Sequence, residues 1–251
     1  MKALITGASS GIGKDMAIIL AEKGYDLILV ARRIDRLNQL KESITNVDVQ
    51  VIQADLSKEE SCIELYNSVN PKEIDFLINN AGFGLCGEFL TADLDIELEM
   101  IRTNITAVHI LTKLFLKDFV NRNSGIILNV ASSAAYMAGP YMGTYYATKN
   151  YVRIITQAIY QELKEKNSKV KISCLCPGPV ATEFNKVANA NFAIPGLKSI
   201  DVAKYAIDKA EKGKLSIVPG TLMKIGTFLL RFTPEKLMLK VSANIQKKKN
   251  S

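Results

Sequence analysis

The stretch MKALITGASSGIG, residues 1–13, decides how the rest of the chain is interpreted. Residues 3–6 form an apolar run of strand length, and residues 12–22 carry apolar side chains at helical spacing, so residues 7–13 connect a strand to a helix. Gly7, Gly11 and Gly13 permit a tight turn, a close approach of backbone to phosphate, and close packing of helix on strand. The spacing is G-x-x-x-G-x-G, which differs from the general G-x-G-x-x-G pattern. The turn either seats a dinucleotide or is a purely structural corner.

Seven strand-like runs recur along the chain, with helical patterns between nearly every successive pair. This alternation predicts an α/β fold, a Rossmann-like doubly wound parallel sheet of about seven strands with helices on both faces. Most of the runs are continuously apolar, as expected where both faces of a sheet are covered. The predicted strands are residues 2–6, 25–31, 47–53, 75–79, 125–131, 170–176 and 215–218.

Composition favours one domain over residues 1–251, because 48% of the residues are hydrophobic and a large core is possible. The net charge of +7 comes from basic residues scattered among 25 acidic ones, so we expect no nucleic acid among the partners. No uncharged apolar run approaches the ~20 residues of a membrane span, and no signal peptide is evident. We therefore expect a soluble, cytoplasmic protein.

The cysteines lack metal-ligand spacing, so no metal site is expected. Alternating apolar residues around Cys174 and Cys176 predict a strand that places both on one face. Reduced, buried thiols are favoured over disulfides at Cys62, Cys86, Cys174 and Cys176.

The second predicted strand ends in LILVARR, which bears on the choice of nucleotide. A site for NAD would place Asp or Glu here to hold the ribose 2′-hydroxyl, whereas a 2′-phosphate requires a cation. Arg32 and Arg33 occupy this place, and the planar guanidinium group suits a phosphate dianion. The alternative is a pair of exposed arginines at the start of a helix, where positive charge is mildly unfavourable. The sequence therefore favours NADP(H) over NAD(H).

The stretch NVASSAAYMAGPYMGTYYATKNYV, residues 129–152, carries the candidate chemistry. It runs from a strand through a loop of small residues into a helix expected to begin near Thr144. Tyr145 and Lys149 are four residues apart and share one helix face. An ammonium group beside a phenol predicts a lowered pKa for Tyr145, and lowering it from ~10 to neutrality takes roughly 4 kcal/mol. Such a tyrosine exchanges a proton with an oxygen whose carbon gains or loses hydride, and a nearby serine hydroxyl holds that oxygen.

The chain resembles the short-chain dehydrogenase/reductase family over nearly its whole length up to about residue 220. The motifs are, in order, TGASSGIG (6–13), ADL (54–56), NNAG (79–82), Asn104, the serine loop, YYATK (145–149) and PGPVAT (177–182). Each motif alone is modest, but the set in this order is highly specific. Together with the arginine pair, the resemblance implies an NADP(H)-dependent oxidoreductase that interconverts a carbonyl and an alcohol.

The resemblance also implies residue roles. Tyr145 is the general acid/base, Lys149 binds the nicotinamide ribose and lowers the pKa of the tyrosine, and Ser132 polarises the substrate carbonyl. Asn104 supports a water-linked proton relay. The other expected cofactor-binding residues are Gly7, Ser9, Ser10, Gly11, Ile12 and Gly13 in the first turn, Arg32, Arg33, Asp55 and Leu56 toward the adenosine, Asn80, Ala81 and Gly82 in the NNAG motif, and Pro177, Gly178, Val180 and Thr182 in the PGPVAT motif.

Two doublets leave alternatives open. Tyr146 is also within helical reach of the lysine, and Ser133 adjoins Ser132; the family's spacing of thirteen residues selects Ser132 with Tyr145. The only histidine is His109, so neither a Ser-His-Asp triad nor a His-based metal site is easily assembled, and a packing or surface role is favoured. A catalytically inactive dinucleotide-binding sensor or scaffold is the competing class of function. The intact set of Ser, Tyr, Lys and Asn argues against it.

Residues 180–197 form the only long connection, which we interpret as a substrate lid. Few charges occur among the candidate pocket residues, so an apolar carbonyl or alcohol is the expected substrate, although the same residues would also suit a core. The candidates are Phe83, Leu85, Tyr136, Met137, Tyr141, Met142, Phe184, Phe192 and Ile194.

Residues 220–251 form a C-terminal extension with apolar residues at helical spacing and interleaved lysines, which predicts two amphipathic helices broken at Pro234. A cover over the pocket or a subunit contact is favoured. Core packing and an interfacial membrane contact are the alternatives. By resemblance, the helices that contain Asn104 and Tyr145 pair subunits, so a homodimer or homotetramer is expected.

Overall fold

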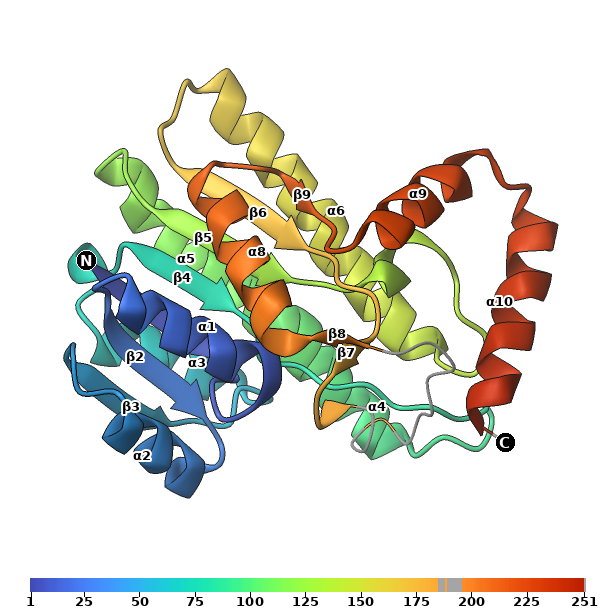
Figure 1. Ribbon diagram of the computed structural model, residues 1–251, viewed down its shortest axis with the longest axis horizontal. Helices are drawn as coiled ribbons and strands as arrows, with labels where there is room; N and C mark the ends of the chain where they lie inside the picture. The colour runs from blue at the N-terminus through green and yellow to red at the C-terminus, as the bar shows by residue number, and fades with distance from the viewer. Residues whose placement is uncertain (185–187, 189–195, 251) are drawn as a thin grey trace.

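We describe the fold from a computed structural model, whose described residues are 1–184, 188 and 196–250. A seven-stranded parallel sheet with the order β3-β2-β1-β4-β5-β6-β9 lies at its centre (Figure 1). The predicted fold class and all seven predicted strands are confirmed, with each strand shortened by at most two residues. The bounds are β1 Lys2–Thr6, β2 Asp26–Ala31, β3 Val49–Gln53, β4 Phe76–Asn79, β5 Ile126–Val130, β6 Lys171–Leu175 and β9 Ser216–Ile217.

The strand order places β1 at the middle of the sheet. Ile5 of β1 pairs with Leu29 of β2 on one side and with Ile78 of β4 on the other. The chain winds outward from β1 through β2 to β3, then returns across β1 and continues through β4 in the other direction. In sheets of this kind, ligands bind beyond the carboxyl ends of the strands where the order reverses. The reversal lies between β1 and β4.

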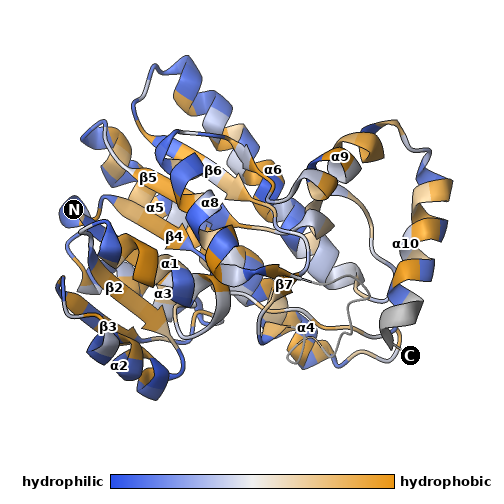
Figure 2. Ribbon diagram, viewed as in Figure 1, coloured by the Kyte–Doolittle hydropathy of each residue, from blue (hydrophilic) through white to orange (hydrophobic). Residues whose placement is uncertain are grey.

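Two apolar layers cover the sheet, because alternate strand residues point to opposite faces. Ala3 and Ile5 face one layer and Leu4 faces the other. The first layer contains α1 Gly11–Glu22, α2 Ile34–Ser43 and α8 Ser199–Glu211, and the second contains α3 Glu59–Ser68, α5 Ala107–Asn121 and α6 Gly143–Glu165. Figure 2 shows the strands as predominantly hydrophobic ribbons between helices of mixed character.

A buried polar network fixes the carboxyl ends of β4 and β5 to the helices behind them. The amide of Asn79 donates to Thr112 Oγ1 at 3.0 Å and to Asn129 Oδ1 at 2.9 Å. The amide of Asn129 donates in turn to Thr156 Oγ1 at 3.0 Å. All four side chains are buried, so these hydrogen bonds form in a low dielectric. They hold the carboxyl ends of β4 and β5 rigidly against the helices.

Two further segments border the site. Short parallel strands β7 Val180–Ala181 and β8 Leu197–Lys198 pair with each other and bracket the long connection. They were not predicted. The extension forms α9 Thr221–Leu229, a 3-10 turn η4 Leu230–Phe232 and α10 Glu235–Asn250, so the predicted helix break at Pro234 is confirmed (Figure 1). Within the described residues, we find no helix whose length and apolarity would suffice to span a membrane.

Candidate active site

The glycine-rich turn connects β1 to α1 at the point where the strand order reverses. Gly7 and Gly11 have φ values of +66° and +55°, a region that disfavours residues with a side chain. A Cβ at Gly7 would lie 2.8 Å from Ala81 Cα, and one at Gly13 would lie 2.5 Å from the carbonyl oxygen of Gly7. The turn therefore depends on glycine for both its conformation and its packing against the segment after β4.

Thr6 joins the turn to that segment. Its hydroxyl accepts the backbone N–H groups of Asn80 and Ala81, each at 3.0 Å, and donates to the carbonyl of Ile78 at 3.3 Å. The Asn80 amide donates to the carbonyls of Thr6 and Gly7 at 3.0 and 3.1 Å. The first turn and the NNAG motif thus form one rigid unit.

The start of α1 fits a diphosphate. Ser10 is the N-cap residue, yet its side chain makes no capping hydrogen bond, and the first turn contains no acidic residue. The partial positive charge of the helix N-terminus is therefore not offset by a local carboxylate. Ser9 and Ser10 both direct their hydroxyls to Arg33, whose Nη2 lies 3.0 Å and 2.8 Å from the two Oγ atoms.

The two arginines predicted to bind the nucleotide, Arg32 and Arg33, have different partners. Arg33 lies against the glycine-rich turn, whereas Arg32 pairs with Glu99 at 2.6 Å and is 61% exposed. Sequence analysis missed Arg36, which shares the carboxylate of Glu183 with Arg33 at 2.7 and 3.1 Å. Hydrogen bonds from the two guanidinium groups, first from Arg36, hold the pKa of Glu183 below its ordinary value. Arg36 lies one helical turn after Arg33 on α2, a spacing that could have indicated it.

The remaining predicted cofactor residues flank this turn. Burial alone would raise the pKa of Asp55, but hydrogen bonds from Ser57 keep it below its ordinary value. Leu56 and Val180 are buried. Thr182 faces Gly11, where an added Cβ would lie 3.1 Å from its Cγ2. Pro177 accepts a hydrogen bond from the backbone of Ser133, and Gly178 packs against Met223 of α9.

The catalytic candidates meet beyond the end of β5. Ser132 is the N-cap of the 3-10 turn η3 Ser133–Tyr136, where its Oγ accepts from Ala134 N at 3.1 Å. The Ser132 hydroxyl also lies close enough to the Tyr145 phenol to lower its pKa. Tyr145 lies in the first turn of α6, which begins at Gly143, one residue before the predicted start. Within each doublet, the structure thus brings Ser132 and Tyr145 together.

Lys149 is buried beneath Tyr145. Its Nζ donates to the carbonyl of Val130 at 3.0 Å and lies 5.9 Å from the centre of the Tyr145 ring. Burial lowers the pKa of Lys149 to about 8, against the opposing effect of the nearby Cys174 and Cys176. Gly82 faces this amine, because an added Cβ would lie 3.2 Å from Nζ. The NNAG segment therefore touches the glycine-rich turn through Ala81 and the lysine through Gly82.

The prediction that the pKa of Tyr145 is lowered is wrong when only the groups of the protein itself act on this phenol. Burial raises the pKa of this phenol well above its ordinary value, and the nearby Ser132 hydroxyl offsets only part of the rise. The helical spacing correctly predicted that Tyr145 and Lys149 share a face. Desolvation of a phenolate exceeds the effect of an ammonium that is itself buried and bonded to a backbone carbonyl.

Asn104 lies in a π-helical turn, Arg102–Thr106, between α4 Leu94–Ile101 and α5. Its amide nitrogen donates to the carbonyl of Phe83 at 2.9 Å and to Thr148 Oγ1 at 3.0 Å, and its Oδ1 accepts from Phe83 N at 3.1 Å. Its side chain is thus committed to positioning the segment after the NNAG motif against α6. Single-turn π-helices occur frequently at functional sites. The predicted role of Asn104 in a proton relay stays a prediction.

An apolar cluster surrounds Tyr145. The ring of Phe184 lies 5.4 Å from the Tyr145 ring, and four more predicted pocket residues pack here: Phe83, Leu85, Met137 and Met142. Tyr136 does not, because its ring packs with Cys174, Cys176 and Val218 and lies under the Arg153 guanidinium at 4.3 Å. Tyr141 is only partly buried and is not part of the cluster. Phe192 and Ile194 lie outside the described residues.

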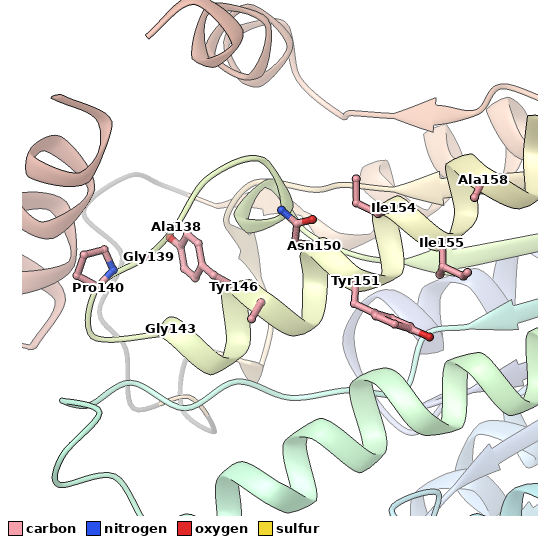
Figure 3. A pocket seen from close by; sticks show the side chains of 11 residues that line it. Ala138, Gly139, Pro140, Gly143, Tyr146, Asn150, Tyr151, Ile154, Ile155 and Ala158 are labelled. Carbon is pink, nitrogen blue, oxygen red and sulfur yellow. The ribbon is translucent and has the colours of Figure 1, made fainter. Parts of the chain in front are cut away.

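The second tyrosine of the doublet packs in the same cluster, with its ring centroid 6.2 Å from that of Tyr145, but its hydroxyl has a separate partner. The amide of Gln246 on α10 donates to the Tyr146 hydroxyl. A hollow of about 830 Å³ extends from Tyr146 along the outer side of α6, past Tyr151 and Ile154 (Figure 3). Tyr146 lines this hollow, whereas Tyr145 does not. The single histidine, His109, is partly buried, and its Nδ1 lies 2.7 Å from the Tyr151 hydroxyl; its packing or surface role stays a prediction.

The predicted burial of the cysteines is confirmed for three of the four. Cys174 and Cys176 lie on one face with their sulfur atoms 3.7 Å apart, and both are buried, as is Cys62. Cys86 is only partly buried, because it lies at the rim of the apolar cluster. Across the part of the chain that the structure describes, no group of three or more His, Cys, Asp or Glu side chains could hold a metal ion.

Comparison with known proteins places this arrangement in a family. The family described as short chain dehydrogenase matches residues 1–192. The chain belongs to the short-chain dehydrogenase family. The human 17-beta-hydroxysteroid dehydrogenase type 3 is 35% identical over 195 residues, covering 75% of this chain and 62% of that protein. The mouse very-long-chain 3-oxoacyl-CoA reductase is 31% identical over 204 residues, covering 78% and 65%. The chain thus spans less than two thirds of the length of either relative.

Solved structures of short-chain dehydrogenases share the fold. One from Sphingobium yanoikuyae in complex with NADPH has a TM-score of 0.84 and 28% identity, with 94% of each chain covered. Another from Burkholderia phymatum in complex with NAD has a TM-score of 0.82 and 23% identity, with 90% of this chain and 91% of that chain covered. The family therefore contains members of closely similar fold with either nucleotide bound.

Proposed function

We propose that this chain is a single-domain, NADP(H)-dependent oxidoreductase that interconverts a carbonyl and an alcohol on a largely apolar substrate. One observation carries the proposal: Tyr145, Ser132 and Lys149 converge beyond β5, and the NNAG segment joins them to the glycine-rich turn. A dinucleotide seated on that turn would have its far end beside the phenol. NADP(H), when bound, supplies or accepts the hydride.

In reduction, Tyr145 would donate its phenolic proton to the substrate oxygen as the carbonyl carbon becomes an alcohol carbon, and in oxidation it would take the proton back. The raised pKa of this phenol keeps it protonated at neutral pH, which is the form that reduction requires. Ser132 would donate a hydrogen bond to the same oxygen. Lys149 would bind the ribose hydroxyls and stabilise the phenolate through its charge.

The preference for NADP(H) rests on Arg33. Its guanidinium group lies against the hydroxyls of Ser9 and Ser10, with Arg36 one helical turn away. Two guanidinium groups and two hydroxyls suit a 2′-phosphate, whereas the ribose hydroxyls of NAD call for a carboxylate.

The substrate class rests on the cluster around Tyr145, where Phe83, Met142 and Phe184 offer aromatic and thioether surface. The names of the two relatives, a hydroxysteroid dehydrogenase and a very-long-chain 3-oxoacyl-CoA reductase, refer to a steroid and to a very long acyl chain, both of which are apolar. We propose residues 180–197 as the substrate lid. A homodimer or homotetramer that pairs the helices of Asn104 and Tyr145 is part of the same proposal.

The test is NADPH consumption with a panel of bulky apolar ketones and one short, charged ketone. We expect turnover of the apolar ketones, a loss of about 100-fold or more in kcat for Tyr145→Phe, and near-normal turnover for Tyr146→Phe. An active Tyr145→Phe beside an inactive Tyr146→Phe would contradict the assignment, and preference for NADH would contradict the role of Arg33. Tight NADPH binding without turnover of any ketone would favour the sensor or scaffold alternative.

A further inference from the structure

The C-terminal helices turn their apolar side chains outward. Along α9 and η4, the side chains of Leu222 and Phe232 are 73% and 72% exposed. On α10, Leu237, Val241 and Ile245 follow one another at intervals of four residues and are each about half exposed. These positions, which we call the apolar stripe, are Leu222, Ile225, Phe228, Leu229, Phe232, Leu237, Val241 and Ile245.

The fully buried residues on the inward face of the same helices are polar, and Met223 of α9 adds one partly buried apolar contact with the core. Ser242 is 2% exposed and donates to the carbonyl of Ala138 at 2.9 Å, and Gln246 is 1% exposed and donates to Tyr146. On α9, Thr227 is the buried residue. A surface helix of a water-soluble domain has the opposite arrangement, with its apolar face inward. The core-packing alternative for the extension is therefore wrong for the apolar stripe.

The extension also carries most of the protein's net charge. Residues 220–251 contain seven basic residues and one acidic residue, which accounts for six of the chain's seven net positive charges. The basic positions are Lys224, Arg231, Lys236, Lys240, Lys247, Lys248 and Lys249, and the acidic one is Glu235. Lys236 and Lys240 are exposed next to the apolar stripe on α10.

Charge decides between two occupants of such a surface. A second copy of the extension would bring the same excess of positive charge against the first, and like charges brought together repel. An anionic bilayer complements both features, because apolar side chains enter the acyl boundary while Lys and Arg extend to the phosphates. Figure 2 shows orange and blue segments alternating along α9 and α10, at the side of the molecule away from β2 and β3.

We propose that α9, η4 and α10 form a docking surface for the face of an anionic phospholipid bilayer. The apolar stripe supplies the inserted side chains, and the described basic residues Lys224, Arg231, Lys236 and Lys240 supply the attraction to the headgroups. The docking surface lies in the plane of the membrane–water interface and does not cross the bilayer. The apolar stripe includes none of the residues assigned to chemistry or to cofactor binding.

The test is sedimentation of the whole protein with vesicles of phosphatidylcholine alone or mixed with phosphatidylserine. We expect binding to the mixed vesicles that weakens with added salt, and weak binding to phosphatidylcholine. The double variant Leu229→Glu/Phe232→Glu should bind the mixed vesicles about tenfold less or weaker still. Ile63→Glu is the matched control: Ile63 is 48% exposed on α3, on the opposite side of the molecule (Figure 1), and should change nothing.

A second variant distinguishes loss of membrane binding from misfolding of the first variant. Lys236→Gln/Lys240→Gln should lower binding by about fivefold per residue without altering the thermal unfolding transition. Equal binding to both kinds of vesicle, or unchanged binding of both double variants, would overturn the proposal. So would absence of vesicle binding combined with self-association that Leu229→Glu/Phe232→Glu abolishes in analytical ultracentrifugation, because a second copy would then occupy the stripe.

Discussion

The Lys149 side chain should destabilise the fold at neutral pH, so its replacement by Met should stabilise the protein while removing activity. Lys149 is 5% exposed, and burial lowers its pKa from 10.5 to about 8. A shift of that size corresponds to about 3 kcal/mol in favour of the neutral form. Met has a similar length and no charge, but it loses the hydrogen bond to Val130, which contributes about 1 kcal/mol. We therefore expect Lys149→Met to be more stable by about 2 kcal/mol at pH 7.

The pH dependence gives the decisive measurement. Because the pKa of Lys149 is lower in the folded than in the unfolded state, the unfolded state binds more protons between pH 8 and pH 10.5, and stability rises with pH across that window. The cost of the charged lysine is fully present below pH 8. The advantage of Lys149→Met should thus be greatest at pH 7 and should shrink toward zero, or reverse, near pH 10.

Urea unfolding of the two proteins at both pH values measures this difference. Lys204→Met on α8 is the control, since Lys204 is exposed and its replacement should change stability by less than about 0.5 kcal/mol at either pH. All other titrating groups are shared, so their contributions cancel in the comparison. If Lys149→Met were less stable than the parent at pH 7, or if the difference were the same at both pH values, the buried charge would not be the cause.

Three further predictions follow from contacts around the cofactor turn. Glu183→Gln removes the negative charge that competes for Arg33, so the KM for NADPH should fall while the KM for NADH stays nearly unchanged; a rise for both would contradict this. Gly13→Ala forces a Cβ into the side-chain nitrogen of Asn80 and should lower stability by about 2 kcal/mol or more, seen as a lower melting temperature that NADPH restores only partly. Thr6→Val leaves two backbone N–H groups without their acceptor and should cost about 3 kcal/mol in urea unfolding, whereas Thr6→Ser should cost much less.

The sheet could be predicted from sequence because both of its faces are covered. Strands such as residues 27–31 are buried on each side, so they appear as unbroken apolar runs. The edge strand β3 contains only exposed and partly buried residues, yet its place in the alternation of strands and helices still identified it. The two-residue strands β7 and β8 could not be found, because pairs this short carry no periodic signal.

The contacts that shape the candidate site were harder to predict. Glu183 meets Arg33 across 150 positions in sequence, and no local pattern indicates such a pair. The polarity of the Tyr145 environment depends on which of its neighbours are buried, and burial follows from the packed fold rather than from the spacing of Tyr145 and Lys149. The direction of a pKa shift set by desolvation therefore could not be obtained from the motif.

The tyrosine doublet connects the proposed chemistry to the proposed docking surface. Neighbouring residues on a helix point about 100° apart, so the two phenol hydroxyls can reach different partners although both rings pack in one cluster. Tyr145 takes the side of Ser132, and Tyr146 takes the side of Gln246 on α10. Since α10 is held at that hydroxyl and at the carbonyl of Ala138, both close to the start of α6, any tilt of α10 on a bilayer would act on the turn that carries Tyr145. The second tyrosine of the doublet is thus better understood as the anchor of the C-terminal helices than as a spare acid.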